Sequence, residues 1–281
     1  MPIQWYPGHM NKARRTIADA MPLTDVLLEV LDARMPAASA NPVLTELRRE
    51  KPCIKVLCKS DLADPEVTAS WLRHFEAGDA AGRVVAIALT TTRPSEARSK
   101  IPELCNRLAP NRVAGKKTVR AMVVGIPNVG KSTLINTLMG RAVAKVGDEP
   151  AVTQGQQRVT LKNGMTISDN PGILWPTIED GEATMRLALG GAIPDIAMDY
   201  ESVALFALRF LLLRYPGTVE ARFKLAPSSA TIAPTDVLDA IGRRRGCLKR
   251  GGIVDRHKAA DVLVHDFRTG SLGRISLEEP R

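Results

Sequence analysis

The sequence contains few cysteines and lacks any long apolar run. Its four cysteines, Cys53, Cys58, Cys105 and Cys247, form no Cys-x-x-Cys pair, and no histidine lies at zinc-ligand spacing from them. This pattern excludes a disulfide framework and a zinc finger, and it indicates reduced thiols in a cytosolic protein. No apolar run reaches the length of a membrane span, and the first residues resemble neither a signal peptide nor a presequence. We therefore expect a cytoplasmic protein without a membrane partner.

Aromatic and acidic residues are also in short supply. Aromatics make up 4% of the 281 residues, and 30 acidic residues stand against 39 basic ones, which gives a net charge of +9. Because no aromatic-rich RNA-recognition strand is present, base readout is not expected. The positive charge favours a polyanionic partner such as RNA, bound through shape and phosphate contacts. A charge that serves only solubility stays open as the alternative.

The strongest motif is the loop of residues 125–132, Gly-Ile-Pro-Asn-Val-Gly-Lys-Ser. It matches the phosphate-binding pattern G-x-x-x-x-G-K-[ST], follows a predicted strand over Val119–Val124 and leads into a predicted helix over Ser132–Met139. Backbone N–H groups and the helix N-terminus can then face phosphate oxygens, while Lys131 reaches the β- and γ-phosphates. A glycine-rich turn that merely contains Lys-Ser is the alternative, and the agreement of strand, loop and helix disfavours it. The predicted nucleotide-binding residues here are Asn128, Val129, Gly130, Lys131, Ser132 and Thr133.

A second motif supplies the expected metal ligands. A short predicted strand over Met165–Ser168 ends in Asp169-Asn170-Pro171-Gly172, a D-x-x-G turn. Its Asp169 would hold Mg²⁺, and the Gly172 N–H would contact the γ-phosphate. The hydroxyls of Ser132 and Thr153 suit the same ion. The sequence therefore predicts Mg²⁺ as a cofactor, bound by Ser132, Thr153 and Asp169.

The guanine-reading motif K-x-D occurs once, and it precedes the phosphate-binding loop. Lys59-Ser60-Asp61 follows the apolar run Cys53–Leu57, as expected of a loop at the carboxyl end of a parallel strand. No lysine after residue 172 has an aspartate two positions on. The Asp61 carboxylate can accept hydrogen bonds from guanine N1–H and N2–H₂. The sequence thus predicts GTP as the nucleotide.

This motif order resembles that of the circularly permuted GTPases. The blocks Trp5-Tyr6-Pro7-Gly8-His9-Met10 and Asp32-Ala33-Arg34-Met35-Pro36 resemble signatures of the bacterial ribosome biogenesis GTPase A family, as do Gly172–Pro176 and Arg244–Leu248. The resemblance spans nearly the full chain. It implies a GTP-hydrolysing switch that binds ribosomal RNA on a large-subunit precursor and promotes its late maturation, with hydrolysis driving release. The expected partners are GTP, GDP, the large ribosomal subunit and its rRNA, and the expected state is a monomer.

Two further roles are assigned through this resemblance. His9 is implied as the catalytic residue, because Ile173 occupies the position where many GTPases carry a water-orienting glutamine. A structural role for His9 stays open as the alternative. Asn128 resembles the asparagine that binds K⁺ in potassium-stimulated GTPases, so K⁺ is a second expected cofactor.

The guanine site departs from the family pattern in two places. Cys58 stands where an asparagine normally precedes K-x-D, and a thiol is a poor hydrogen-bond donor to guanine N7. Ala88 and Leu89 replace small polar residues after the third predicted strand, although a backbone N–H there can still contact the base oxygen. We therefore expect guanine selectivity to survive with weakened affinity. The predicted base-contacting residues are Cys58, Lys59, Ser60, Asp61, Ala88 and Leu89.

Predicted strands alternate with amphipathic helices as far as Trp175, which indicates an α/β fold with a doubly wound, mostly parallel sheet. The predicted strands before the phosphate-binding loop are Asp25–Leu31, Cys53–Cys58, Arg83–Leu89 and Val119–Val124. The polar run Ala109–Lys117 is the expected linker that closes the permutation. Beyond Trp175 the helical periodicity covers Gly181–Leu189, Glu201–Leu213, Pro234–Arg245 and Arg256–Phe267. We expect a GTPase domain over residues 1–176 and a smaller helical domain over 177–281.

Basic residues crowd the predicted loop between the last two helices, where residues 243–258 hold only one acid, Asp255. Phosphate contact with RNA is the favoured interpretation, and a solvated charged face is the alternative. A regulatory GTPase that binds non-ribosomal RNA also stays open. A small-molecule kinase would need an acceptor pocket and acidic base residues that the sequence does not show. The predicted RNA-binding residues are Arg243, Arg244, Arg245, Lys249 and Arg250.

Overall fold

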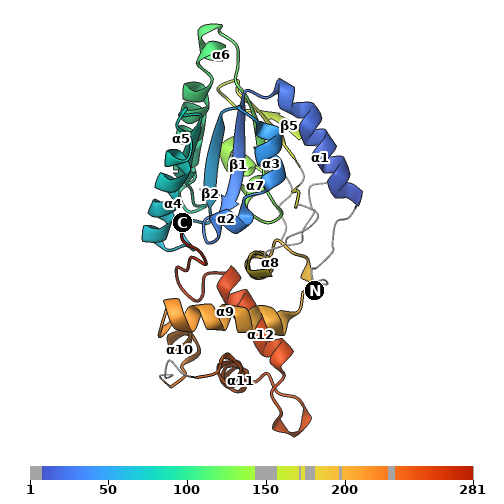
Figure 1. Cartoon of the computed structure of the whole chain (residues 1–281), viewed down its shortest axis with the longest axis vertical. Coiled ribbons are helices and arrows are strands. Elements are labelled where there is room, and N and C mark those ends of the chain that lie inside the picture. The colour runs from blue at the N-terminus through green and yellow to red at the C-terminus, as the bar shows by residue number, and fades with distance from the viewer. Residues whose placement is uncertain are drawn as a thin grey trace.

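The computed structural model describes residues 8–142, 157–170, 172–174, 181–195, 198–226 and 232–280, without the side chains of residues 8–10 and 157. Figure 1 shows a sheet flanked by helices, with a cluster of further helices below it. The strands are β1 (Val26–Asp32), β2 (Cys53–Cys58), β3 (Val84–Ala88), β4 (Arg120–Val124), β5 (Gln157–Thr160) and β6 (Thr166–Asp169). The helices of the sheet region are α1 (Gly8–Ala20), α2 (Pro36–Ser39), α3 (Pro42–Arg48), α4 (Pro65–Ala77), α5 (Pro94–Leu108), α6 (Pro110–Ala114) and α7 (Lys131–Met139). The helical region contains α8 (Gly181–Leu189), α9 (Tyr200–Arg214), α10 (Thr218–Phe223), α11 (Pro234–Arg245) and α12 (Arg256–Arg268).

The strand order in the sheet is β3-β2-β1-β4-β6-β5, and every neighbouring pair is parallel except β5 with β6. This confirms the predicted α/β fold with a mostly parallel sheet. The chain runs outward from β1 through β2 to β3 and then returns to the other side of β1 with β4. Open α/β sheets bind ligands at such a reversal, beside the carboxyl ends of the strands. The sequence pattern did not predict β5, because its Gln-Arg-Val-Thr run lacks the apolar character of a buried strand.

The central strand β1 is buried along its whole length because helices cover both faces of the sheet. Leu28 on one face belongs to the cluster that includes Ile101 of α5. Leu27 on the other face belongs to the cluster that includes Ile17 of α1. This two-sided burial explains why the early strands were predictable as continuous apolar runs, with ends that differ from the observed ones by at most one residue.

Local capping signals set the start of α4. The Asp64 carboxylate accepts hydrogen bonds from Glu66 N at 2.9 Å and from Val67 N at 3.3 Å, and Pro65 occupies the first position of the helix. The run 109–117, predicted as an irregular linker, instead contains α6, which begins at Pro110. A proline fixes φ near the helical value and needs no hydrogen-bond acceptor in the first turn, so it favours a helix start there despite the polar composition.

The helical region is organised around α9, which packs against α8, α10, α11 and α12. The helices predicted after Trp175 are confirmed as α8, α9, α11 and α12, whereas the six-residue α10 was not predicted. The predicted domain boundary after Pro176 lies outside the described residues. Among the residues that the structure describes, no helix is long and apolar enough to cross a membrane.

The chain returns from the helical region to the sheet at its end. After α12, Ile275 N donates a hydrogen bond to Leu62 O at 2.9 Å, and Leu277 N donates to Arg34 O at 2.7 Å. Figure 1 shows the C-terminal label beside α4, on the sheet side of the molecule. Residues that are far apart in the sequence therefore lie side by side next to the loops that follow β1 and β2.

The turn from β4 into the next loop depends on Gly125, whose φ is +149° and where a Cβ atom would lie 2.5 Å from Val30 O. We expect Gly125→Ala to lower the free energy of unfolding by about 2–4 kcal/mol, because the added atom meets the backbone of the central strand. Urea unfolding measures this change. Gly273→Ala is the control, since φ is +94° but nothing lies within 4 Å there. The control should lose about 1 kcal/mol, and equal losses in both variants would contradict the close approach.

Candidate nucleotide site

The carboxyl ends of neighbouring parallel strands bring the predicted motifs together. Lys59 follows β2, Asp32 ends β1, the loop of residues 125–130 follows β4, and Asp169 ends β6. Because these four strands are adjacent in the sheet, all four segments lie along one edge. This edge is next to the reversal between β1 and β4, where a ligand site is expected.

The loop of residues 125–130 has the backbone conformation of a phosphate-binding loop. Asn128 and Gly130 have φ of +59° and +107°, so the chain turns tightly before α7 begins at Lys131. Lys131 is buried, and its Nζ donates to Ile126 O within the loop at 2.7 Å. Burial lowers the pKa of Lys131 to about 8, against the opposing effect of the Asp169 carboxylate. A buried lysine at the N-terminus of a helix is suited to bind an anion, because phosphate oxygens would supply the missing negative charge.

Asp169 is the buried acid of the site. Its side chain is 1% exposed, and neither carboxylate oxygen has a hydrogen-bond partner among the described residues. Burial raises the pKa of Asp169, and the nearby Lys131 ammonium opposes that shift. An unpaired buried carboxylate is costly unless it binds a cation or a donor. Together with the half-buried Ser132 at the start of α7, it forms a donor set of oxygens that suits Mg²⁺. Thr153, the third predicted ligand, lies outside the described residues.

The glycine of the D-x-x-G turn packs directly on the phosphate-binding loop. A Cβ atom on Gly172 would lie 2.8 Å from Pro127 N and 2.9 Å from Lys131 Nζ. The next residue, Ile173, donates its N–H to Gly125 O at 3.3 Å, and its carbonyl accepts from Asn41 Nδ2 at 2.8 Å. The structure therefore brings Gly172 to the phosphate-binding loop, where the sequence placed a γ-phosphate contact.

The side chain of Ile173 is buried in the cluster with Ile17 and Leu27, so it points into the core. It therefore offers no group that could orient a water molecule. His9, the residue predicted to supply that function, lies in the first turn of α1, and its side chain is outside the described part of the chain. The packing of α1 against Ile173 nevertheless places this helix beside the D-x-x-G segment.

The predicted guanine-reading loop meets both of its expected neighbours. Ser60 N donates to Leu89 O at 3.2 Å, which joins the loop to the segment after β3, where Ala88 and Leu89 were predicted to support the base. A Cβ atom on Gly130 would lie 3.4 Å from Cys58 Cβ, so the start of this loop also touches the phosphate-binding loop. Burial raises the pKa of Cys58 to about 12, which keeps the thiol neutral. Asp61 is half-buried at the edge of the sheet.

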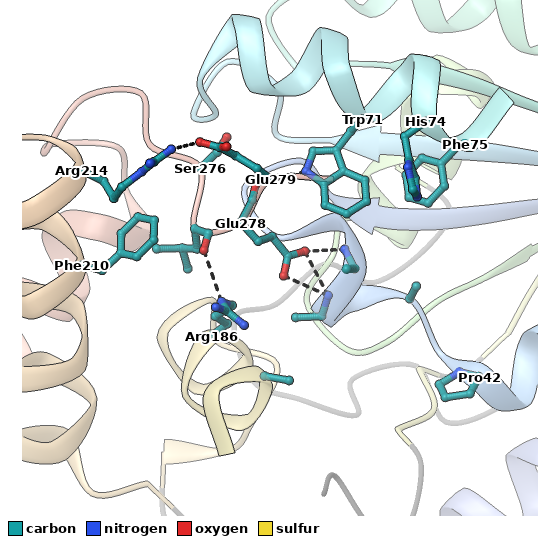
Figure 2. A pocket seen from close by; sticks show the side chains of 15 residues that line it. Pro42, Trp71, His74, Phe75, Arg186, Phe210, Arg214, Ser276, Glu278 and Glu279 are labelled. Carbon is teal, nitrogen blue, oxygen red and sulfur yellow. Dashed lines mark hydrogen bonds and ion pairs between the residues drawn. The ribbon is translucent and has the colours of Figure 1, made fainter. Parts of the chain in front are cut away.

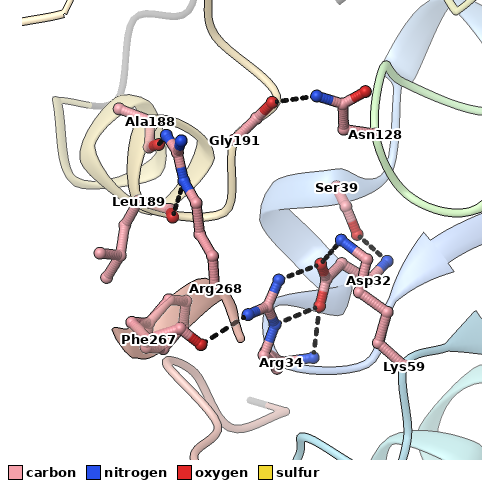
Figure 3. A network of polar contacts seen from close by, with 10 residues as sticks. All are labelled: Asp32, Arg34, Ser39, Lys59, Asn128, Ala188, Leu189, Gly191, Phe267 and Arg268. Atoms are coloured by element: carbon pink, nitrogen blue, oxygen red, sulfur yellow. Dashed lines mark hydrogen bonds and ion pairs between the residues drawn. The ribbon is translucent and has the colours of Figure 1, made fainter. Parts of the chain in front are cut away.

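Asp32 is a site residue to which sequence reasoning gave no role. Figure 3 shows its carboxylate between Lys59 and Arg34. Lys59 Nζ donates to Oδ2 at 2.9 Å, while Arg34 donates through Nε to Oδ1 at 2.9 Å and through Nη2 to Oδ2 at 2.8 Å. Burial alone would raise the pKa of Asp32, but the Arg34 guanidinium and the Lys59 ammonium outweigh it and hold that pKa well below its usual range. An acid at the carboxyl end of the central strand, one strand away from K-x-D, is the signal that could have revealed this residue.

The same network reaches the helical region. Arg34 is 1% exposed, its Nη1 donates to Phe267 O at 3.2 Å, and its guanidinium lies 4.6 Å from the centre of the Phe267 ring. Asn128 of the phosphate-binding loop donates through Nδ2 to Gly191 O, just after α8, at 2.8 Å (Figure 3). The phosphate-binding loop therefore contacts the helical region directly, and the loop that carries Lys59 is linked to it through Asp32 and Arg34.

The structure separates the predicted RNA-binding residues into two groups. Arg245 pairs with Asp266 at 3.4 Å and lies over the Phe223 ring, so it contributes to the packing of the helical region. Lys249 approaches Asp255 at 4.0 Å but stays exposed. Arg243, Arg244 and Arg250 are exposed and form no ion pair within the described residues. The exposed basic residues occupy the end of α11 and a short hairpin closed by a bridge between Leu248 and Val254.

Comparisons with known proteins agree with this geometry. Residues 120–207 match the family described as 50S ribosome-binding GTPase. The ribosome biogenesis GTPase A of Priestia megaterium is 42% identical over 283 residues, which cover 100% of this chain and 98% of that protein. The ribosome biogenesis GTPase A of Thermotoga maritima is 33% identical over 278 residues, which cover 99% of this chain and 95% of that protein. The GNP-bound structure of YlqF from T. maritima has a TM-score of 0.67 at 28% identity and covers 96% of this chain and 99% of that chain.

The Asp32 network allows a test of stability. We expect Asp32→Asn to lower the free energy of unfolding by about 3–5 kcal/mol, because it leaves the buried Arg34 guanidinium without its partner. Since folding lowers the pKa of Asp32, its stabilising effect is present above the unfolded-state pKa of about 4 and is lost as the pH falls below that value. The free energy of unfolding of the variant should therefore fall less steeply toward acid pH than that of the wild-type protein. Chemical unfolding between neutral and acid pH measures both effects.

Glu96→Gln is the control for this test, because Glu96 also pairs with a basic residue, Lys100, at 2.6 Å, but on the surface of α5. We expect it to change the free energy of unfolding by less than about 0.5 kcal/mol. A loss of similar size in the two variants would show that the Asp32 network is not a special determinant of stability.

Proposed function

The chain belongs to the ribosome biogenesis GTPase A family, and from this premise we propose that its GTPase cycle controls binding to ribosomal RNA on a precursor of the large ribosomal subunit. It is a circularly permuted GTPase that acts in ribosome biogenesis. The finer proposal is that the GTP-bound form binds the particle, promotes a late step of its maturation and leaves after hydrolysis. The observation that carries it is a pair of links between the nucleotide site and the helical region. Asn128 bonds directly to Gly191, and Lys59 is linked through Asp32 and Arg34 to Phe267. These contacts give the nucleotide a physical route to the basic surface.

Within the site, the proposed roles follow the geometry. Lys131 neutralises the β- and γ-phosphates, and the backbone of residues 125–130 encloses them. Mg²⁺, held by Ser132, Thr153 and Asp169, would supply positive charge to the phosphates when it is bound. The unpaired, buried Asp169 carboxylate supports this assignment.

We propose His9 as the residue that positions the attacking water. The burial of Ile173 supports this role, since the usual glutamine position is apolar and faces the core. Asn128 is proposed as a K⁺ ligand on the family resemblance alone. We further propose that the protein acts as a monomer in the cytoplasm, where ribosomal particles mature.

The proposed RNA-binding surface consists of Arg243, Arg244, Lys249 and Arg250, which we call the basic hairpin. These side chains are exposed, and they lie on the part of the helical region that is farthest from the sheet in Figure 1. Such a surface can neutralise RNA phosphates without blocking the nucleotide site. Arg245 is not included, because its pairing with Asp266 gives it a structural role.

The base preference tests the nucleotide assignment. We expect GTP and GDP to compete for binding while ATP does not, since Asp61 accepts from guanine N1–H and N2–H₂. Asp61→Asn should shift the preference toward xanthine nucleotides by at least about tenfold, because the amide replaces one acceptor by a donor. Competition against a fluorescent guanine nucleotide measures both results. ATP binding as well as GTP would contradict the proposed reader.

Charge reversal tests the basic hairpin. The double variant Arg244→Glu with Lys249→Glu should bind ribosomal particles more weakly, and its affinity should depend less on salt, with a slope of log affinity against log salt that is smaller by about 1.5. Intrinsic GTP hydrolysis should stay unchanged, because neither residue belongs to the nucleotide site. Co-sedimentation with large-subunit precursors over a salt series, with GDP or a non-hydrolysable GTP analogue, measures the effect.

The matched control for this experiment reverses two exposed basic residues of the sheet region, Arg107→Glu with Lys117→Glu, and changes the net charge equally. We expect the control to keep most of the salt slope of the wild-type protein. If the control and the hairpin variant lose affinity equally, the protein binds the particle through its overall charge and not through the basic hairpin.

A further inference from the structure

The segment after α12 covers the guanine-reading loop. Ile275 N donates to Leu62 O at 2.9 Å, and Ser276 Oγ accepts from Asp64 N at 3.1 Å. A Cβ atom on Gly270 would lie 2.6 Å from the Leu62 side chain, so the turn that precedes the segment also approaches this loop. Residues 270–278 therefore run along the outer side of residues 60–64.

Arg274 makes the most direct of these contacts. Its Nη2 donates to Ser60 O at 3.2 Å, and its Nε donates to Ala63 O at 2.9 Å. One guanidinium thus bridges the two ends of the turn that contains Asp61. The turn has a single internal bond in its backbone, from Leu62 N to Lys59 O at 2.9 Å. A planar group with donors in a fixed arrangement holds two carbonyls at a set spacing, whereas the flexible ammonium of a lysine imposes no such spacing.

The segment that carries Arg274 is anchored independently of it. Figure 2 shows that Ser276, Glu278 and Glu279, which come after Arg274 in the chain, lie between α4 and the helical region. They line a pocket of about 750 Å³. The carboxylate of Glu278 accepts from Ala38 N at 3.0 Å, and its carbonyl accepts from Trp71 Nε1 at 3.1 Å. Ser276 N donates to Tyr215 OH at 3.0 Å. Removal of the Arg274 side chain should therefore leave the segment in place and remove only the two bonds to Ser60 O and Ala63 O.

The position of Asp61 decides how well guanine is read. The carboxylate must meet N1–H and N2–H₂ of the base together, and hydrogen bonds weaken steeply when their geometry is poor. Lys59 at the start of the loop is already held by Asp32. The remainder of the turn is held from outside by Arg274 at Ser60 O and Ala63 O and by Ile275 N at Leu62 O. The loop is thus fixed on both sides of Asp61, once from the sheet and once from the end of the chain.

We propose that Arg274 is a positioning residue for guanine recognition, which bridges Ser60 O and Ala63 O and thereby aligns the Asp61 carboxylate with the base. This inference rests on the proposed role of Lys59-Ser60-Asp61 as the guanine reader. It means that the guanine site is incomplete without a residue from the end of the chain. Nucleotide binding then depends on the docking of the segment that carries Arg274, in addition to the D-x-x-G turn.

The test compares GDP with inosine diphosphate, which lacks the 2-amino group of guanine. The ratio of their affinities reports the hydrogen bond between Asp61 and that group. We expect Arg274→Ala to weaken GDP binding by about fivefold and to weaken inosine diphosphate binding clearly less, so that the ratio falls. Arg274→Lys should recover only part of the ratio, because a flexible lysine ammonium lacks the fixed planar donors that set the spacing of the two carbonyls. Calorimetry with the full-length protein measures the affinities, and thermal unfolding checks that each variant folds.

Arg268→Ala is the matched control, because Arg268 also donates to two backbone carbonyls, Ala188 O at 2.9 Å and Leu189 O at 3.2 Å, but away from the guanine loop. It should leave the ratio of GDP to inosine diphosphate affinity at the wild-type value. An unchanged ratio in Arg274→Ala, or an equal loss for both nucleotides, would overturn the proposal. If Asp61→Asn also fails to move base preference, the proposed reader itself is wrong; if Asp61→Asn moves it and Arg274→Ala does not, only the role of Arg274 is wrong.

Discussion

The carboxylate of Asp32 is the contact on which both halves of the molecule depend. It pairs with Lys59 of the loop after β2 and with Arg34, and Arg34 in turn contacts Phe267 of α12. Because Asp32 and Arg34 are both 1% exposed, loss of the carboxylate would leave a buried guanidinium without a counter-charge. The nucleotide loops and the helical region are therefore held in a defined relation by electrostatics as well as by apolar packing. A movement of α12 relative to the sheet would have to break the contact of Arg34 with Phe267 or move Arg34 and Asp32 together with the helix.

The sheet explains why a permuted chain can still build a GTPase site. A ligand at the carboxyl edge of parallel strands contacts whichever loops lie side by side there, and adjacency in the sheet does not depend on order in the sequence. The central β1 places the loop after β2 on one side and the loop after β4 on the other. Permutation changes which segments follow the site in the chain. Here the D-x-x-G turn leads into the helical region, and the basic hairpin lies beyond it.

The strands other than β5, most helices and the nucleotide motifs were predictable because each carries a local signal. An apolar run followed by a recognisable loop motif identifies β2 and β4. Asp64 followed by Pro65 is the local signal for the start of α4. Contacts between distant segments carry no such signal. The charge of Arg245 looked unbalanced in its own stretch of sequence, yet Asp266 from the next helix neutralises it. Arg274 was invisible for a different reason, since its partners are backbone carbonyls that any residue could supply.

The contacts of residues 267 and 274 with the loops after β1 and β2 can form only late in protein synthesis. The strands β1 and β2 and the loop after them are translated early, whereas Phe267 and Arg274 are translated more than two hundred positions later. Contacts of such long sequence separation form late in folding, after the chain has closed a large loop. A nascent chain can therefore build the phosphate-binding loop before its guanine-reading loop is held in place. With the proposed role of Arg274, firm binding of guanine nucleotide would then begin only after residues 270–278 have been made and have docked beside the loop that follows β2.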